Sequence, residues 1–331
     1  MKKRVLGLLM VCAVTFSTIM GGAAYADEKE AKSGEDATLN IAYQYGLGYA
    51  PVTIAQDQKL IEAAYKEATG ADLEITWTQM SSGADINTAI ASGDIDAGFM
   101  GVGPAVSGIV SKLGYRIFTN LSGQEHQVMS NDPDVKSLTD LIGSDKQLAL
   151  VNIGSIQHII LAEALAARGE DPHALDANIV AMKHPDGMAA LESGAVAAHL
   201  TANPFLYEEQ ENKDLNQVDD LSDVWTNENS FLVGICSEKL HDETPDLYNA
   251  LCEGIAEGQE VIAKSAGDAA KITASYDGND EETEAKFLEK GTYNAETRGI
   301  GDLAKFMFEN GFIDSDPGSY EDLVFDNVKG D

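Results

Sequence analysis

The sequence predicts an α/β protein made of two similar halves. A unit that occurs twice carries this prediction: residues 89–97 (AIASGDIDA) and 190–198 (ALESGAVAA) each indicate a helix end, a Ser-Gly turn and a short apolar strand. A loop rich in Gly, Asn or Pro follows each copy, at residues 101–104 and 201–204. Strands that alternate with helices favour mainly parallel sheets with right-handed crossovers. Two such halves usually enclose a cleft, and clefts bind small ligands.

The N-terminus indicates a secretory signal peptide over residues 1–26. A positive head precedes an apolar run at residues 5–20, and an A-x-A cleavage site ends at Ala26. A membrane anchor is the alternative, which we disfavour because the apolar run is short for a bilayer span. Cys12 follows a residue too large for lipoprotein processing, so we expect no lipid anchor. We therefore predict cleavage after Ala26, a disordered acidic leader at residues 27–36, and a periplasmic or secreted mature protein.

The chain is strongly acidic. It carries 55 Asp and Glu residues against 22 Lys and Arg residues, which gives a net charge of −33. The signal peptide holds three basic residues and no acidic one, so its removal leaves about −36. Such a chain repels nucleic acid and anionic lipid. The 305 residues that remain exceed the usual size of one hydrophobic core, so we expect two domains.

The sequence contains no recognisable catalytic or metal-binding motif. We find no nucleophile elbow, P-loop, paired-cysteine motif or zinc-protease motif, and the six histidines show no metal-ligand spacing. We therefore expect neither enzyme activity nor a cofactor or metal. Only Cys236 and Cys252 remain after processing. Export permits a disulfide, but we interpret them as two separate buried thiols.

The first half begins with strand–helix units. Helix signals such as Pro51 in a first turn and Gly70 at a helix end support this interpretation. The predicted elements are a strand at 39–43, a loop at 44–50, a helix at 51–69, a strand at 73–77, a loop at 81–83, a helix at 84–92, a strand at 95–99 and a helix that begins at Pro104.

The second half repeats this order. Its predicted elements are a strand at 147–151, a loop at 152–155, a helix at 156–168, a strand at 178–182, a loop at 183–186, a helix at 187–193, a strand at 196–200 and a loop at 201–204. We expect two hinge segments to join the halves, near residues 116–130 and 230–237. The first lobe is then predicted to hold residues 37–122 and 238–331, with a helical C-terminal part, and the second lobe residues 123–237.

We expect the ligand at the loops that follow the strands. Ligands of open α/β sheets bind beyond the carboxyl ends of the strands, and helix N-termini there offer N–H groups and partial positive charge. This pattern favours a small anion or zwitterion. Any one glycine in these loops is better explained by a turn, and His184 is expected either to contact the ligand or to cap the next helix. The candidate ligand-binding residues are Gln44, Tyr45, Tyr49, Ser81, Ser82, Gly101, Val102, Gly103, Asn152, Gly154, Ser155, His184, Thr201 and Asn203.

Several short motifs resemble a known family. They are GYAP at 48–51, MSSG at 80–83, ASGDIDAG at 91–98 and GVGP at 101–104, with further similarity at 190–198 and in TPDL at 244–247. Together they resemble the substrate-binding proteins of nitrate/sulfonate/taurine-type ABC importers, over residues 39–312. Ala197 and His199 depart from the family pattern in the second copy of the repeat.

The resemblance implies a two-lobed periplasmic binding protein-like fold with two crossing segments, which closes on its ligand like a trap. It also implies delivery to a membrane permease with a cytoplasmic ATPase, and ligand contacts from the loops at 44–49, 81–83, 101–104, 152–155 and 201–203. We expect a monomer that binds a sulfonate or taurine-like ligand. The alternatives are an aromatic or heterocyclic vitamin precursor stacked on Tyr43, Tyr45 or Tyr49, and a sensory binding module.

Overall fold

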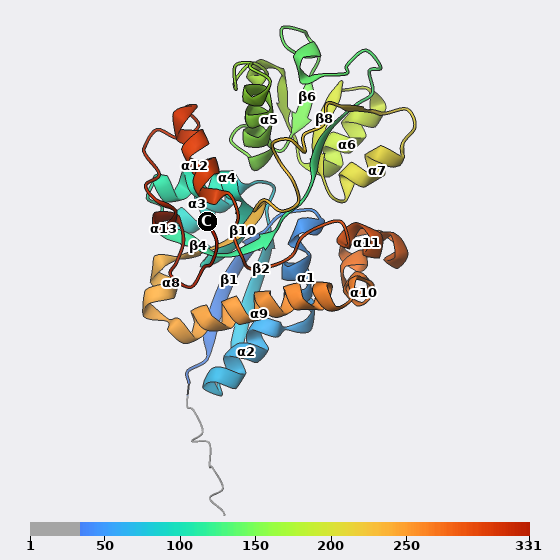
Figure 1. Ribbon diagram of the computed structural model, residues 1–331. Coiled ribbons are helices and arrows are strands. Elements are labelled where there is room, and N and C mark those ends of the chain that lie inside the picture. The colour runs from blue at the N-terminus through green and yellow to red at the C-terminus, as the bar shows by residue number, and fades with distance from the viewer. Residues whose placement is uncertain (1–33) are drawn as a thin grey trace, which may run out of the picture. The chain divides into compact units, whose positions relative to one another are not determined.

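Two five-stranded sheets, each flanked by helices, make up the part of the chain that the computed structural model describes, residues 34–331 (Figure 1). The predicted signal peptide and residues 27–33 of the predicted leader lie outside the described residues. The last three leader residues are hydrogen-bonded near the end of a helix. The Gly34 N–H donates to the Thr69 carbonyl over 2.8 Å, and the Asp36 carboxylate accepts from the Asp72 N–H over 3.0 Å.

The first sheet has the strand order β2-β1-β3-β10-β4. Its strands are β1 (Ala37–Tyr43), β2 (Leu73–Gln79), β3 (Ala97–Gly101), β4 (Tyr115–Ser122) and β10 (Leu232–Ser237). β1 pairs in parallel with β2 and β3, whereas β10 pairs antiparallel with both β3 and β4. One reversed strand therefore lies inside an otherwise parallel sheet.

The second sheet has the same design, with the order β7-β6-β8-β5-β9. Its strands are β5 (His126–Ser130), β6 (Leu148–Leu150), β7 (Ile179–Ala181), β8 (Ala198–Ala202) and β9 (Asn216–Val218). β6 pairs in parallel with β7 and β8, and β5 is the reversed strand between β8 and β9. The predicted fold, with a mainly parallel sheet in each lobe, is confirmed.

Helices cover both sheets, and α9 runs across α1 and α2 (Figure 1). The helices are α1 (Ala50–Gln58), α2 (Leu60–Thr69), α3 (Gly83–Ser92), α4 (Val102–Val110), α5 (Ile156–Ala167), α6 (His184–Ser193), α7 (Phe205–Glu211), α8 (Glu238–Glu243), α9 (Pro245–Lys264), α10 (Ala266–Asp277), α11 (Glu281–Leu288), α12 (Ile300–Glu309) and α13 (Tyr320–Leu323). Three short 3₁₀ turns are η1 (Leu47–Tyr49), η2 (Leu138–Asp140) and η3 (Asp176–Asn178).

The single helix expected at residues 51–69 is divided into α1 and α2. Lys59 between them has a left-handed backbone, with φ of 54° and ψ of 44°. Both helices pack on α9, whose Gly254 and Gly258 permit very close contact. A Cβ atom at Gly254 would lie 2.6 Å from the Ile61 nitrogen, and one at Gly258 would lie 2.4 Å from the Pro51 carbonyl oxygen. The break lets the first turn of each helix meet the same face of α9.

The strand and helix bounds near the predicted loops differ from the expected ones. β3 and β8 each reach two residues further than expected, because their last residues are paired: Gly101 with Leu232, and Ala202 with His126. α6 begins at His184 instead of residue 187. The expected hinge segment at 230–237 contains β10, which belongs to the first sheet.

The chain passes between the two sheets at residues 123–125 and again at 219–231, and these crossing segments lie against each other. The Trp225 indole N–H donates to the Gln124 carbonyl over 3.2 Å. A Cβ atom at Gly123 would lie 2.2 Å from the Asn227 carbonyl oxygen, so only glycine fits there. The two crossing segments therefore lie in contact with each other where they connect the two sheets.

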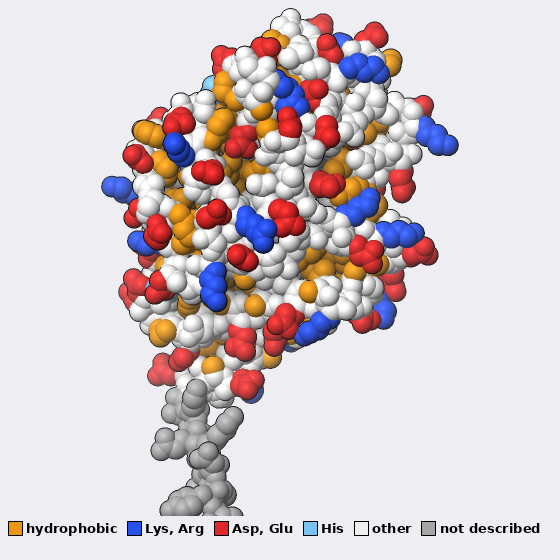
Figure 2. Space-filling model, in the orientation of Figure 1, with side chains coloured by type: hydrophobic (Ala, Val, Ile, Leu, Met, Phe, Trp, Pro, Cys, Tyr) orange, Lys and Arg blue, Asp and Glu red, His pale blue; other side chains and the backbone are white. Residues whose placement is uncertain are grey.

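The surface agrees with the acidic composition. Asp and Glu side chains are scattered over the face seen in Figure 2, with Lys and Arg side chains among them. No helix in residues 34–331 is long and apolar enough to cross a membrane. Cys236 in β10 is buried and Cys252 in α9 is half-buried, and both are free thiols.

Candidate ligand-binding cleft

A cleft lies where the strand-end loops of both sheets meet. Loops that follow β1, β2 and β3 line one side, and loops that follow β6, β7 and β8 line the other. The empty space, including the part that opens to solvent, is about 570 Å³. The predicted residues that the structure brings together here are Gln44, Tyr45, Tyr49, Ser81, Gly101, Ser155, His184 and Asn203.

Six predicted residues lie outside the cleft lining. Ser82 and Gly154 serve their own loops: the Ser82 hydroxyl caps α3 by accepting from the Asp85 N–H, and the Gly154 N–H donates to His158. The Asn152 amide donates to the Ile153 carbonyl over 2.6 Å. The remaining three are Val102 and Thr201, which are completely buried, and Gly103, which packs against α5.

Several lining residues were not among the predicted ones. Gln124 and Phe231 come from the crossing segments, and Gln157 and Lys183 lie beside the predicted residues Ser155 and His184. The crossing residues carry no loop signal of their own, because they follow or precede buried strands. The one indication in the sequence that these residues line the cleft was their position between the two lobes, since the crossing segments border the cleft in folds of this kind.

Tyrosine side chains form one wall of the cleft. The Gln44 amide donates to the Tyr49 hydroxyl over 2.9 Å, and burial raises the pKa of Tyr49. The Lys183 ammonium lies 5.4 Å from the centre of the Tyr45 ring, a cation–π contact between a loop of the second sheet and a loop of the first. Tyr43, the third member of the predicted cluster, packs edge-on against Trp77 and does not line the cleft.

The cleft is almost free of charge. Among residues 34–331, no carboxylate lines it, and Lys183 is its one permanent charge. Burial, and secondarily the neighbouring His199, lowers the pKa of His184 to about 3, so that this imidazole is neutral near pH 7. The site therefore offers one cation, hydroxyl and amide groups, and helix N-termini to a ligand.

A buried chain of hydrogen bonds leads away from the cleft. The Gln157 amide lies 3.1 Å from His184 Nε2, His184 Nδ1 lies 3.3 Å from His199 Nε2, and His199 Nδ1 lies 2.6 Å from the Glu209 carboxyl. Burial raises the pKa of Glu209 to about 8. The chain fixes the orientation of His184 and Gln157 from behind the cleft.

Two cleft amides have atoms without a hydrogen-bond partner among the described residues. Both side-chain atoms of Gln124 are in this state, although the residue is only 1% exposed. Asn203 is 3% exposed; its Nδ2 donates to the Phe287 carbonyl over 2.8 Å, while its Oδ1 has no partner. Buried polar atoms are rarely left unpaired, so these atoms are available to a ligand.

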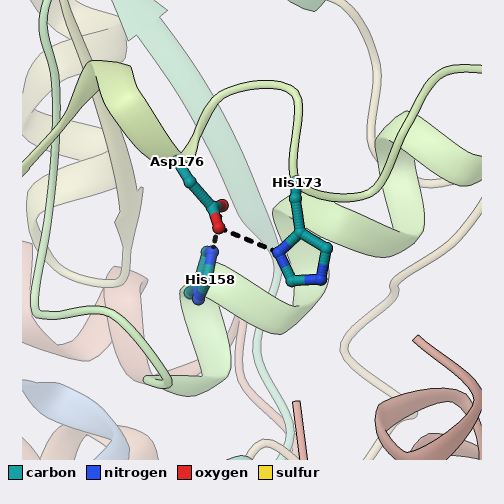
Figure 3. Close-up of side chains that lie close together, drawn as sticks. All are labelled: His158, His173 and Asp176. Atoms are coloured by element: carbon teal, nitrogen blue, oxygen red, sulfur yellow. Dashed lines mark hydrogen bonds and ion pairs between the residues drawn. The ribbon is translucent and has the colours of Figure 1, made fainter. Parts of the chain in front are cut away.

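A second cluster, of His158, His173 and Asp176, lies near the cleft loop at residues 152–155 (Figure 3). The Asp176 carboxylate lies 2.8 Å from His158 Nε2 and 2.8 Å from His173 Nδ1. His158 Nδ1 accepts from the Gly154 N–H over 3.0 Å, so its proton is on Nε2 and no lone pair is left there for a metal. The cluster is therefore suited to hydrogen bonding and does not fit a metal site.

The same cluster joins the two lobes. His173 Nε2 lies 2.8 Å from the Asn310 carbonyl at the end of α12, and Phe312 stacks on the His173 ring with centroids 4.6 Å apart. These hydrogen bonds, first to Asn310 and then to Asp176, raise the pKa of His173. A carbonyl on one side of the ring and a carboxylate on the other favour the form of His173 that carries a proton on both nitrogens.

The comparisons with known proteins agree with this architecture. The model of a family described as NMT1-like matches residues 32–276. No curated protein sequence matches the chain. The alkanesulfonate-binding protein SsuA from Xanthomonas axonopodis pv. citri, bound to MOPS, is a similar solved structure, with a TM-score of 0.72 and 15% identity over 88% of this chain and 99% of that one.

Two further solved structures share the fold. The periplasmic nitrate-binding protein NrtA from Synechocystis PCC 6803 has a TM-score of 0.68 and 14% identity, over 84% of this chain and 82% of that one. The Candida albicans CA3427 gene product, described as having the generic periplasmic binding protein fold, has a TM-score of 0.67 and 14% identity, over 84% and 91%. At these identities the similarity is one of fold.

Proposed function

Because the chain belongs to the NMT1-like family, we propose that it is an extracytoplasmic solute-binding protein that delivers its ligand to an ABC permease. The observation that supports this most directly is the cleft, to which three strand-end loops of each sheet contribute. A ligand held by both sheets stabilises their closed arrangement, which a membrane partner is then able to recognise. The similar structures are binding proteins, which supports a role without catalysis.

For the ligand, we propose a small anion or zwitterion of the sulfonate or taurine type. Lys183 supplies the positive charge, and the Ser155 hydroxyl, which accepts from the His158 N–H at the start of α5, retains a proton to donate. The start of α5 adds backbone N–H groups and partial positive charge. Two similar proteins are named for alkanesulfonate and nitrate binding, which supports an oxyanion class.

Isothermal titration calorimetry with taurine, ethanesulfonate, nitrate and bicarbonate tests this ligand class. We expect binding of at least one, and a loss of about tenfold or more in affinity for Lys183→Met, since a hydrogen bond to a charged group contributes roughly 1.5–3 kcal/mol. Lys213→Met is the matched control, because Lys213 is exposed and lies outside the cleft. Absence of binding by folded protein to all four would remove the proposed class.

An aromatic or heterocyclic vitamin precursor is the second candidate ligand. Tyr45, Tyr49 and Phe231 line the cleft, and their rings offer stacking surfaces to a flat molecule. A bound-state structure decides between the two candidates. A flat ligand between aromatic rings would favour the precursor, and an oxyanion at Lys183 would favour the first proposal.

A further inference from the structure

We infer that the ligand carries an N–H or O–H hydrogen-bond donor, which the side-chain oxygens of Gln124 and Asn203 accept, and that oxyanions without such a donor are rejected. This inference rests on the proposed function and narrows it. Its basis is the pair of buried cleft amides with unpartnered atoms.

Asn203 has a fixed orientation. Its Nδ2 donates to the Phe287 carbonyl over 2.8 Å, and a flipped amide would place two oxygens against each other. Oδ1 is therefore the atom left without a partner in this cleft-lining residue, and an oxygen accepts hydrogen bonds only. A ligand satisfies it by bringing an N–H or O–H group.

Gln124 offers an acceptor and a donor side by side. Neither Oε1 nor Nε2 has a partner among residues 34–331, and its backbone carbonyl accepts from Trp225 and His126, which holds the residue in place. In either orientation of the amide, Oε1 requires a donor from the ligand. An oxyanion satisfies Nε2 and leaves Oε1 unpaired.

Both amides border the same turn of the first lobe. A Cβ atom at Gly48 would lie 3.0 Å from the Gln124 Nε2, and one at Gly46 would lie 3.6 Å from the backbone carbonyl oxygen of Asn203. No carboxylate of residues 34–331 lines the cleft, so the donor meets neutral oxygens. A neutral amino or amide group fits these acceptors. An ammonium fits if the anionic end of the same molecule is near Lys183.

Nitrate, sulfate and simple alkanesulfonates have no N–H group. Their binding would leave two buried acceptors unpaired in a closed cleft, which costs about tenfold or more in affinity for each acceptor. A site built to receive a donor discriminates strongly against an analogue that lacks it.

Thermal-shift screening and calorimetry with matched ligand pairs test the inference. Taurine is paired with propane-1-sulfonate, and nicotinamide with methyl nicotinate, within a broader panel of small solutes with and without N–H groups. We expect every hit to carry an N–H or O–H donor, and taurine and nicotinamide to bind at least tenfold tighter than their donor-free partners if they are hits. If the two members of each pair bind with equal affinity, this inference is wrong, while the proposed function is unaffected. A panel without any hit would remove the proposed function, and this inference with it.

Substitutions at Gln124 and Asn203 test whether these two residues cause the preference for ligands with a hydrogen-bond donor. Gln124→Leu and Asn203→Leu should each reduce the ratio of affinities within a pair, and Gln124→Glu, which keeps an acceptor, should preserve or increase the ratio for taurine. Asn120→Leu is the control: Asn120 is equally buried, donates to the Asn294 carbonyl over 2.7 Å and has an unpartnered Oδ1, but lies outside the cleft. A general loss of stability affects the binding of both ligands of a pair equally, so it leaves the ratio of their affinities unchanged. An unchanged ratio in both leucine variants would refute the assignment.

Discussion

At the scale of single residues, buried imidazoles and one buried carboxyl determine how the second lobe responds to pH. Burial lowers the pKa of His126, His184 and His199 to about 3, so each is neutral in the folded protein near pH 7. The unfolded chain takes up these protons near pH 6.5. Stability from these three residues is therefore present above pH 6.5 and is lost as the pH falls toward 3.

Glu209 acts in the opposite direction. Its pKa is about 8 in the folded protein and 4.5 in the unfolded chain, so its contribution is present below pH 4.5 and is lost as the pH rises through 8. We predict that Glu209→Gln flattens the loss of unfolding free energy between pH 6.5 and 8.5, to which Glu209 contributes about 2 kcal/mol in the wild type. Urea unfolding at several pH values measures it. An identical slope in the variant would contradict the burial of an ionisable carboxyl here.

At the scale of elements, two glycines in α9 allow α1 and α2 to pack against one face. The periodicity of residues 51–69 predicts helix but not the break at Lys59, because the break depends on α9, nearly 200 residues away in the sequence. Helix caps are more predictable from sequence. Ser155 and Ser82 are local signals, and both serve as N-caps.

We predict that Gly258→Ala destabilises the protein by about 1–3 kcal/mol, because the new methyl group meets the Pro51 carbonyl, which is backbone and does not rotate away. Gly267→Ala in α10 is the matched control. Its backbone is helical and a Cβ atom there meets only Ser265 Oγ at 4.0 Å, so we expect no loss and a gain of up to roughly 1 kcal/mol. Chemical denaturation measures the unfolding free energy of both variants. Equal values would contradict the prediction and would show that α9 shifts to make room for the methyl group.

At the scale of the whole molecule, contacts between the lobes extend well beyond the cleft. His173 of the second lobe binds Asn310 and Phe312 of the first. Burial, and secondarily Asp302 of α12, raises the pKa of Glu163 in α5 to about 7. The α4–α5 contact is close as well: a Cβ atom at Gly103 of α4 would lie 3.2 Å from Ile159 Cγ1 of α5.

Both titrating groups favour lobe contact at lower pH. His173 has a raised pKa, so its contribution is present at low pH and is lost as the pH rises. Glu163 loses its proton above about pH 7 and then repels Asp302. We predict a smaller radius of gyration for the unliganded protein at pH 5.5 than at pH 8.5, measured by X-ray scattering. The double variant His173→Gln, Glu163→Gln should lack the difference, and a wild type with the same radius at both pH values would contradict the prediction.

The limits of sequence-based prediction also become clear at this scale. Alternating strands and helices are local patterns, so the fold and eight of the cleft residues were accessible from the chain alone. Gln124 and Phe231 were not, because they lie on crossing segments whose mutual position depends on both completed sheets. Val102 and Thr201 were expected in loops, but Val102 begins α4 and Thr201 lies within β8, and both are completely buried.

The position of the reversed strand β10 has a consequence for the order in which the chain is synthesised and folds. β10 lies between β3 and β4 and pairs with both, yet it is made after the whole second lobe. A chain that ends before residue 232 leaves two open strand edges in the first sheet. The first lobe therefore completes its sheet only after the second lobe has been synthesised. The second lobe is one continuous stretch of the chain, whereas the first lobe is made of two separate stretches.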